Sequence, residues 1–215
     1  MKRFITILLS FLFISFQSAK AEMGIGLTGA FHMFDVSGTE TTRSSGEKNN
    51  GSHDEDVGVL EIFAEAMLDN GSTVGVAYIP TRDMGSKSRS DTNSEGDTGT
   101  YKAAAELDNV IQFYTDIALP NDVLGSSLYV KVGVQHATIT TLESLNSGSS
   151  YPNEDVLGYT VGLGAKGDLP YGNNLYYKAD LTYTDFEDYE AQASHNKVEA
   201  ELEDIALKLS LGYKF

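Results

Sequence analysis

The chain ends on "IALKLSLGYKF" (residues 205–215), a stretch in which apolar and polar or small side chains alternate strictly. Its odd positions are Ile, Leu, Leu, Leu, Tyr and Phe, whereas its even positions are Ala, Lys, Ser, Gly and Lys. A period of two places alternate side chains on opposite faces of a β-strand. The last strand therefore has one apolar face and one charged face, and the fold depends on which of them points inward.

Seven further segments alternate in the same way, and two kinds of connection separate them. Short connections occur near 69–72, 120–126 and 170–174. Long ones, rich in Ser, Gly, Asn and Asp, occur near 39–56, 83–100, 143–155 and 187–199. Repeated hairpins have this organisation, so the sequence predicts an all-β protein of eight antiparallel strands connected up and down.

The N-terminus predicts export from the cytoplasm. Lys2 and Arg3 precede the apolar run 4–16, and Ala19 and Ala21 occupy the small positions of a cleavage site. These are the parts of a secretory signal peptide. We expect residues 1–21 to be removed and residues 22–215 to form a single domain.

Composition excludes several classes of function. The chain has 31 acidic and 15 basic residues, a formal net charge of −16, and loss of the signal peptide makes it more negative. Nucleic acid is not an expected partner, because phosphate binding requires a basic face. Without Cys, neither disulfides nor thiolate metal sites are possible. After the signal, no apolar run approaches the roughly 18 residues of a membrane-spanning helix.

Two barrel folds have eight alternating strands, and they differ in which face points inward. In a water-soluble barrel the aliphatic face fills the core, whereas in an outer-membrane barrel it contacts lipid. Three features favour the membrane barrel: glycines gather on the polar face, short and long connections lie on opposite sides, and aromatic residues gather near both ends of the aliphatic face. We therefore predict a transmembrane β-barrel with a polar lumen and a lipid-facing apolar exterior.

With these features the region 22–215 resembles the small eight-stranded outer-membrane barrels of the OmpX and OmpA transmembrane-domain type. The resemblance implies that the final strand pairs with the first segment near 23–33. It also implies that this strand contains the signal read by the barrel-assembly machinery, and that the protein resides in the outer membrane of a Gram-negative bacterium. The residues of the implied signal are Leu207, Leu209, Leu211, Tyr213 and Phe215.

Charged residues recur on the predicted inner face. Side chains fill the interior of an eight-stranded barrel, and a buried charge must be paired or it destabilises strongly. We therefore expect a salt-bridge layer that plugs the lumen. Its candidate members are Glu61, Glu65, Glu106, Asp108, Asp116, Lys131, Lys166, Lys178, Asp180 and Lys208.

This interpretation predicts a non-enzymatic surface protein that displays acidic extracellular loops. Its expected partners are outer-membrane lipids and lipopolysaccharide, with divalent cations at the loops; we expect a monomer without a cofactor. A narrow porin-like channel, gated by the charged layer, is the first alternative. The second is a lipid-modifying enzyme at the outer rim, where His136 lies near Thr138 and His195 follows Ser194, although neither belongs to a recognisable nucleophile motif.

The stretch 91–102 resembles the start of a calcium-binding loop. Asp91, Asn93, Glu95 and Asp97 have the spacing at which oxygen ligands alternate around a Gly turn. The twelfth position, which should be a bidentate Glu, is Lys102. The ligand set is therefore incomplete, and no other metal site is expected.

Overall fold

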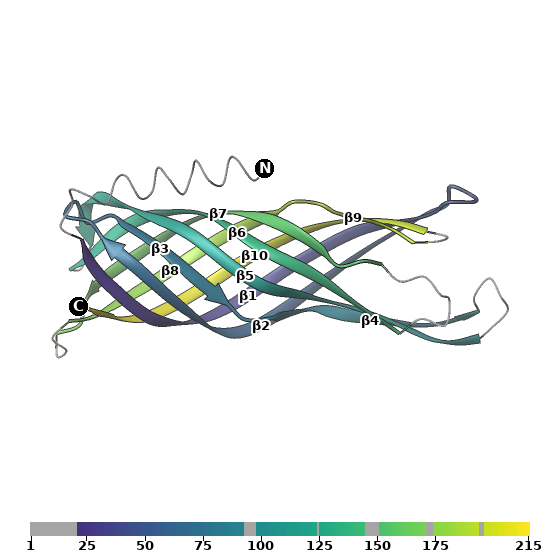
Figure 1. Cartoon of the computed structure of the whole chain (residues 1–215), viewed down its shortest axis with the longest axis horizontal. Coiled ribbons are helices and arrows are strands. Elements are labelled where there is room, and N and C mark those ends of the chain that lie inside the picture. Colours follow the sequence, from purple (N-terminus) through teal and green to yellow (C-terminus); the bar gives the residue numbers. More distant parts are fainter. Residues whose placement is uncertain (1–20, 93–97, 124, 145–150, 171–173, 194–195) are drawn as a thin grey trace.

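The computed structural model describes residues 21–92, 98–123, 125–144, 151–170, 174–193 and 196–215, and their regular structure is β-strand (Figure 1). Residues 1–20 of the expected signal peptide lie outside this range. Within it, no helix has the length and apolar character to cross a membrane. The strands are β1 (Glu22–Thr42), β2 (Lys48–Met67), β3 (Thr73–Ile79), β4 (Arg82–Thr92), β5 (Thr98–Val123), β6 (Ser126–Ser144), β7 (Glu154–Asp168), β8 (Leu175–Phe186), β9 (Tyr189–Gln192) and β10 (Asn196–Lys214).

The strands form one closed antiparallel ring. Their order is β1-β2-β3-β5-β6-β7-β8-β10, and β10 pairs back onto β1 from Gly24 opposite Lys214. β3 and β4 both pair with β5, and β8 and β9 both pair with β10, so the ten elements make eight strands around the ring. The predicted eight-stranded barrel is confirmed, and so is the pairing of the last strand with the first.

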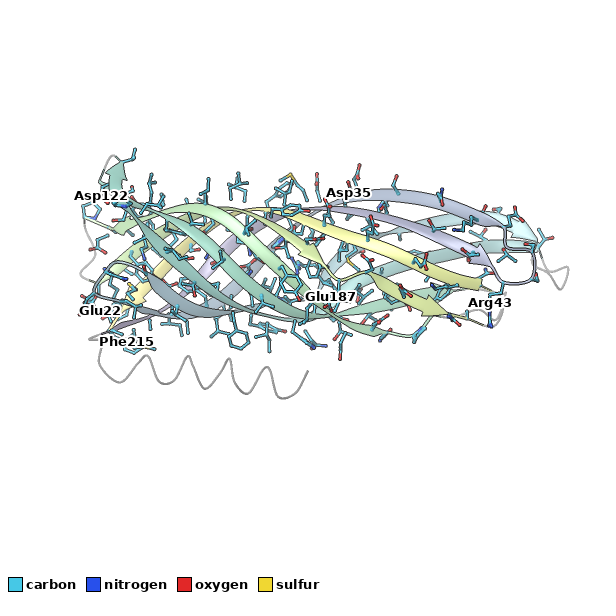
Figure 2. The ribbon with its side chains drawn as sticks, turned by 90° about the horizontal axis from the view of Figure 1, so that it is seen from above. Glu22, Asp35, Arg43, Asp122, Glu187 and Phe215 are labelled. Atoms are coloured by element: carbon cyan, nitrogen blue, oxygen red, sulfur yellow. The ribbon has the colours of Figure 1, made fainter. Side chains whose placement is uncertain are left out.

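Short turns join the strands at one end of the barrel, and long hairpins join them at the other. Figure 2 shows Glu22, Asp122 and Phe215 at one end, here called the short-turn end, and Arg43 at the other, the long-hairpin end. The expectation that 39–56, 83–100 and 187–199 are connections is wrong for most of their described residues, which are strand. β1 continues to Thr42 and β2 resumes at Lys48, so the first long hairpin is almost entirely strand.

Aliphatic side chains cover the outside of the half nearer the short turns. Leu209 is 64% exposed and Phe215 71% exposed, although both lie in or beside a continuous strand ladder. In the same half the buried side chains are largely polar or charged. A protein surrounded by water does not expose so large an apolar surface, so this half has the polarity of a membrane barrel. Other exposed apolar residues include Met23, Ile25, Leu27, Leu60, Ile62, Phe113, Ile117, Leu163, Leu181, Leu207 and Leu211.

A β-bulge in β5 reverses the faces that the sequence predicts for two acidic residues. Asn109 has a φ of 53°, and the register between β5 and β6 shifts between Asp108 and Ile111. The extra residue turns Leu107 inward, where it is fully buried, and moves Glu106 and Asp108 to the outer face. Their assignment to the lumen layer is therefore wrong. Asp108 Oδ1 instead accepts a hydrogen bond of 2.5 Å from Thr81 Oγ1.

Toward the long-hairpin end the barrel divides into two arms. The β2–β3 ladder ends at Ile62 opposite Tyr78, and the β7–β8 ladder ends at Gly158 opposite Phe186. Beyond these points, the described strands pair within two groups: the first arm, β9-β10-β1-β2, and the second arm, β4-β5-β6. The start of β7 belongs to the second arm, because it pairs with β6 as far as Glu154 opposite Ile139. Figure 1 shows these groups diverging on the side away from the C-terminus.

Candidate functional site

A first group of ion pairs crosses the interior near the short turns. We call Glu65, Asp116, Lys131, Lys178 and Asp180 the lower cluster. Lys178 Nζ lies 2.7 Å from Glu65 Oε2 and 2.6 Å from Asp116 Oδ2. Lys131 Nζ lies 2.8 Å from Asp116 Oδ1 and 3.5 Å from Asp180 Oδ1. All five side chains are buried and come from β2, β5, β6 and β8, so the cluster ties opposite walls together.

Tyrosine hydroxyls provide further hydrogen bonds to the carboxylates of the lower cluster. Tyr114 and Tyr176 donate to the two oxygens of Glu65 at 2.5 and 2.8 Å. Tyr129 donates to Asp180 Oδ1 at 2.7 Å. Lys131 Nζ also lies 3.9 Å from the centre of the Tyr114 ring, a cation–π distance. The charges are therefore compensated by hydrogen bonds as well as by each other, as a desolvated ion pair requires.

Glycines on the inner face make room for these tyrosine rings. A Cβ at Gly75 would lie 2.3 Å from Cζ of Tyr114, and one at Gly164 would lie 2.3 Å from Cζ of Tyr129. A side chain at either position would displace a ring that holds the lower cluster. This crowding accounts for the glycines that the sequence places on the polar face.

A second group of ion pairs lies farther from the short turns. We call His32, Glu61, Arg82, Asp204 and Lys208 the upper cluster. The two ring nitrogens of His32 lie 2.8 Å from Asp204 Oδ2 and 3.1 Å from Glu61 Oε1. Lys208 Nζ lies 2.8 Å from Glu61 Oε1, and Arg82 Nη1 lies 3.3 Å from Asp204 Oδ2. These residues come from β1, β2, β4 and β10.

His32, Arg82 and Asp204 are members of the upper cluster that the predicted charged layer does not include. Arg82 is fully buried, and its guanidinium carbon lies 5.1 Å from the centre of the Phe34 ring. Asp204 could have been predicted, because it lies two residues before Ala206 and so continues the even-numbered inner face of the last strand. Arg82 follows Pro80 at the start of β4, next to a stretch expected to be a loop. No pattern in the sequence indicates that its side chain points inward.

Three predicted members of the charged layer belong to neither cluster. Lys166 lies at the edge of the lower cluster, where its Nζ donates to Thr73 Oγ1 at 2.6 Å and lies 5.6 Å from the Tyr129 ring centre. Glu106 and Asp108 join neither cluster. The residues of the implied assembly signal, Leu207, Leu209, Leu211, Tyr213 and Phe215, all point outward and are exposed.

Little free space remains between the clusters. The described side chains there, including Tyr114, Lys131, Lys178 and Lys208, leave a cavity of about 20 Å³. That volume is close to what one water molecule needs. The interior between the clusters is therefore filled by side chains.

Beyond the upper cluster the interior changes to apolar packing. Phe34, Ile79, Leu107 and Val110 form a contiguous buried group with residues of both arms, and we call this the apolar layer. Its other members include Met84, Ile139, Val156, Phe186, Tyr189 and Leu202.

The described residues contain neither an assembled catalytic group at the outer rim nor an assembled calcium site. His136 Nε2 lies 3.9 Å from Asp155 Oδ2, but the Thr138 hydroxyl donates to the same carboxylate at 2.8 Å and is not held by the imidazole. His195 lies outside the described residues. So do Asn93, Glu95 and Asp97, while Asp91 is in β4. In the described ranges, no three His, Cys, Asp or Glu side chains are placed to hold a metal ion.

The chain was compared with known proteins. No protein-family model matches it, and no curated protein matches it in sequence. Its structure is similar to that of the outer membrane protein OprG from Pseudomonas aeruginosa, with a TM-score of 0.54 and 16% identity over 91% of this chain and 97% of that one. The fold is that of an outer-membrane β-barrel.

Two further solved structures align with lower scores. The outer membrane protease OmpT from Escherichia coli has a TM-score of 0.49 and 11% identity, covering 92% of this chain and 98% of that chain. Neisserial surface protein A has a TM-score of 0.40 and 14% identity, covering 88% and 99%. At these identities the likeness concerns architecture and does not extend to an activity.

Proposed function

We propose that this protein is a non-enzymatic surface protein of a bacterial outer membrane, with a barrel closed by its two ionic clusters. It reaches the membrane through the N-terminal signal peptide and the assembly machinery, and it functions as a monomer. The long hairpins point away from the cell, and lipid and lipopolysaccharide surround the apolar band. The observation on which this proposal rests is the combination of an aliphatic exterior with paired charges inside.

The outer face of the first arm supports a surface role. Asp185, Glu203, Asp35 and Asp54 are exposed and lie directly opposite one another across β8, β10, β1 and β2. Like charges in register destabilise a sheet, so this acidic row is not there for stability. Its position just beyond the apolar band would place it at the level of lipid headgroups, where divalent cations concentrate.

Fractionation and conductance together test this function. The protein should appear in the outer-membrane fraction and migrate differently on gels before and after heating, as closed barrels do. Purified protein in planar bilayers should show no steady ion current, because the described interior between the clusters holds about one water molecule. Large, steady openings would instead support a porin-like channel, and an altered lipid A mass spectrum in expressing cells would support an enzyme.

A further inference from the structure

A cavity lies between the two arms, at the long-hairpin end. Its volume is about 520 Å³. Val36, Val198 and Leu202 line it from the first arm, and Met84, Ala105 and Ile139 line it from the second. These six side chains give each arm an aliphatic stretch at the cavity, and uncharged polar residues such as Asn49, Asn50 and Thr141 line the rest. Neither arm alone encloses it.

The apolar layer closes the cavity on the side of the membrane. Phe34, one inward-facing position before Val36, belongs to that layer and stacks against His32 with ring centres 5.9 Å apart. The layer thereby separates the cavity from Arg82 and the rest of the upper cluster. A molecule in the cavity would therefore contact aliphatic, tyrosine and uncharged polar side chains and would not reach the ion pairs of the upper cluster.

The cavity is too large to be a packing defect. Protein interiors are close-packed and leave few voids larger than a water molecule. Apolar walls in contact with water cost about 25 cal/mol per Å², so an unfilled space of this kind favours an apolar occupant. Its volume lies within the roughly 300–1,000 Å³ of small-molecule sites.

The charges at the cavity select against anions. Among its lining residues the charged ones are Glu40 and Glu201, and the other titratable residues are His53, Tyr151 and Tyr189. Glu40 Oε1 accepts hydrogen bonds from Tyr151 Oη at 3.0 Å and from Asn196 Nδ2 at 2.7 Å, which hold the carboxylate in place. A fixed carboxylate in a partly apolar site repels an anionic ligand strongly, because the local dielectric is low.

We propose that the space between the arms binds a small, uncharged apolar molecule. Both arms contribute to the site, with the apolar layer as its floor and Glu40 at its polar margin. The Tyr189 hydroxyl donates to the carbonyl of Pro152 at 2.7 Å and helps hold the connection beyond β6 against the first arm. The proposal does not depend on whether the ionic clusters conduct.

Fluorescence titration in lipid nanodiscs tests the proposal with two probes that share one ring system. N-phenyl-1-naphthylamine is uncharged, and 1-anilinonaphthalene-8-sulfonate is anionic; empty nanodiscs supply the baseline for both. The uncharged probe should show a saturable component with one site per barrel. The anionic probe should bind about tenfold more weakly or less, and Glu40→Gln should reduce that difference.

Cavity-filling variants locate the site. Ala105→Phe and Ala200→Phe insert a ring from opposite arms, and each should weaken binding of the uncharged probe about tenfold or more. Thr140→Phe adds the same ring on the outer face, next to Ile139, and should bind like the wild type. Heat-modifiability confirms folding, and the two filling variants substitute for each other if one fails to fold.

Three outcomes would overturn the proposal. They are the absence of a saturable component above empty nanodiscs, unchanged binding in both folded filling variants, and tighter binding of the anionic probe than of the uncharged one. The last result would assign the site to an anion.

Discussion

In the half of the barrel near the short turns, aliphatic side chains face outward and charges face inward, whereas in the arms the same strands show the reverse. β1 makes the change within three residues: Met33 is exposed, Phe34 is buried, and Asp35 is exposed again. β10 makes it between Leu202, which is buried, and Ile205, which is exposed. Both changes occur at the same height, since Met33 pairs with Ile205.

The surroundings of each half explain the reversal. In lipid the outer face must be apolar, so the charged residues lie inside and pair with each other and with tyrosines. In water the outer face takes the charges, and burial of aliphatic side chains between the arms becomes favourable. The 11 residues from Ile205 to Phe215 rise about 25 Å along a tilted strand, which matches the apolar band of such barrels.

The largest effect is expected from removing one inner charge of the lower cluster. Lys178→Met leaves the buried Glu65 carboxylate without its lysine partner and leaves Lys131 as the remaining lysine paired with Asp116, so it should cost about 3–5 kcal/mol of unfolding free energy. Denaturant titration of the refolded barrel measures this. Lys214→Met is the matched control, because its pair with Asp168 is exposed and should be worth about 0–1 kcal/mol. Equal losses in the two variants would mean that the inner charges are as well solvated as the outer ones.

A charge placed on the outer face should distinguish the two halves directly. Leu209→Arg puts a cation in the middle of the apolar band and should cost about 2–4 kcal/mol in a bilayer. Glu201→Arg introduces the same side chain on the outer face of the same strand, but within the first arm. It should change the free energy of unfolding by about 0.5 kcal/mol or less. The comparison uses denaturant titration in lipid vesicles. A tolerated Leu209→Arg would place that face in water.

The bulge at Asn109 brings apolar side chains inward where the polarity changes. Its left-handed φ of 53° is unfavourable for residues with a Cβ, though less so for Asn. Asn109→Ala should therefore lose about 1–2 kcal/mol relative to Asn109→Gly. Thermal unfolding of both variants checks the sign. If Ala is as stable as Gly, the bulge is not held in the left-handed conformation.

The acidic row of the first arm should give the smallest effect, and in the opposite direction. Asp35 lies opposite both Glu203 and Asp54. Asp35→Asn removes two like-charge contacts and should stabilise the barrel by about 0.2–1 kcal/mol. The gain should shrink as salt is added, because exposed charges are screened. A loss of stability in Asp35→Asn at low salt would contradict this reading of the row.

Much of the lower half could be predicted from the sequence because its period of two is unbroken. Ile205 to Phe215 and Lys208 lie where alternation places them, and the closing pair of strands follows from the ring. The alternation predicts the wrong face for Glu106 and Asp108, because the bulge at Asn109 reverses it. A single Asn in a strand does not reveal a bulge from the sequence.

The arms were missed for a different reason. Ser-, Gly- and Asp-rich stretches are typical of loops, yet here they alternate with inward Val36, Val57 and Val198. The pattern that predicts the arms is a shift of the apolar residues between odd and even positions. It occurs between Met33 and Phe34 and between Ile205 and Leu202. The pairing of Arg82 with Asp204 could not be read at all, since 122 residues separate them and only the closed ring brings them together.

Accessibility of spin labels along β10 in lipid bilayers tests the central claim most directly. The chain has no Cys, so single cysteines can be introduced without a background. Labels at Leu207, Leu209 and Leu211 should collide with oxygen dissolved in the lipid and not with an aqueous nickel chelate. Labels at Glu199, Glu201 and Glu203 should show the reverse. Nickel-accessible labels at all three leucines would show that the aliphatic face does not meet lipid, and the account would be wrong.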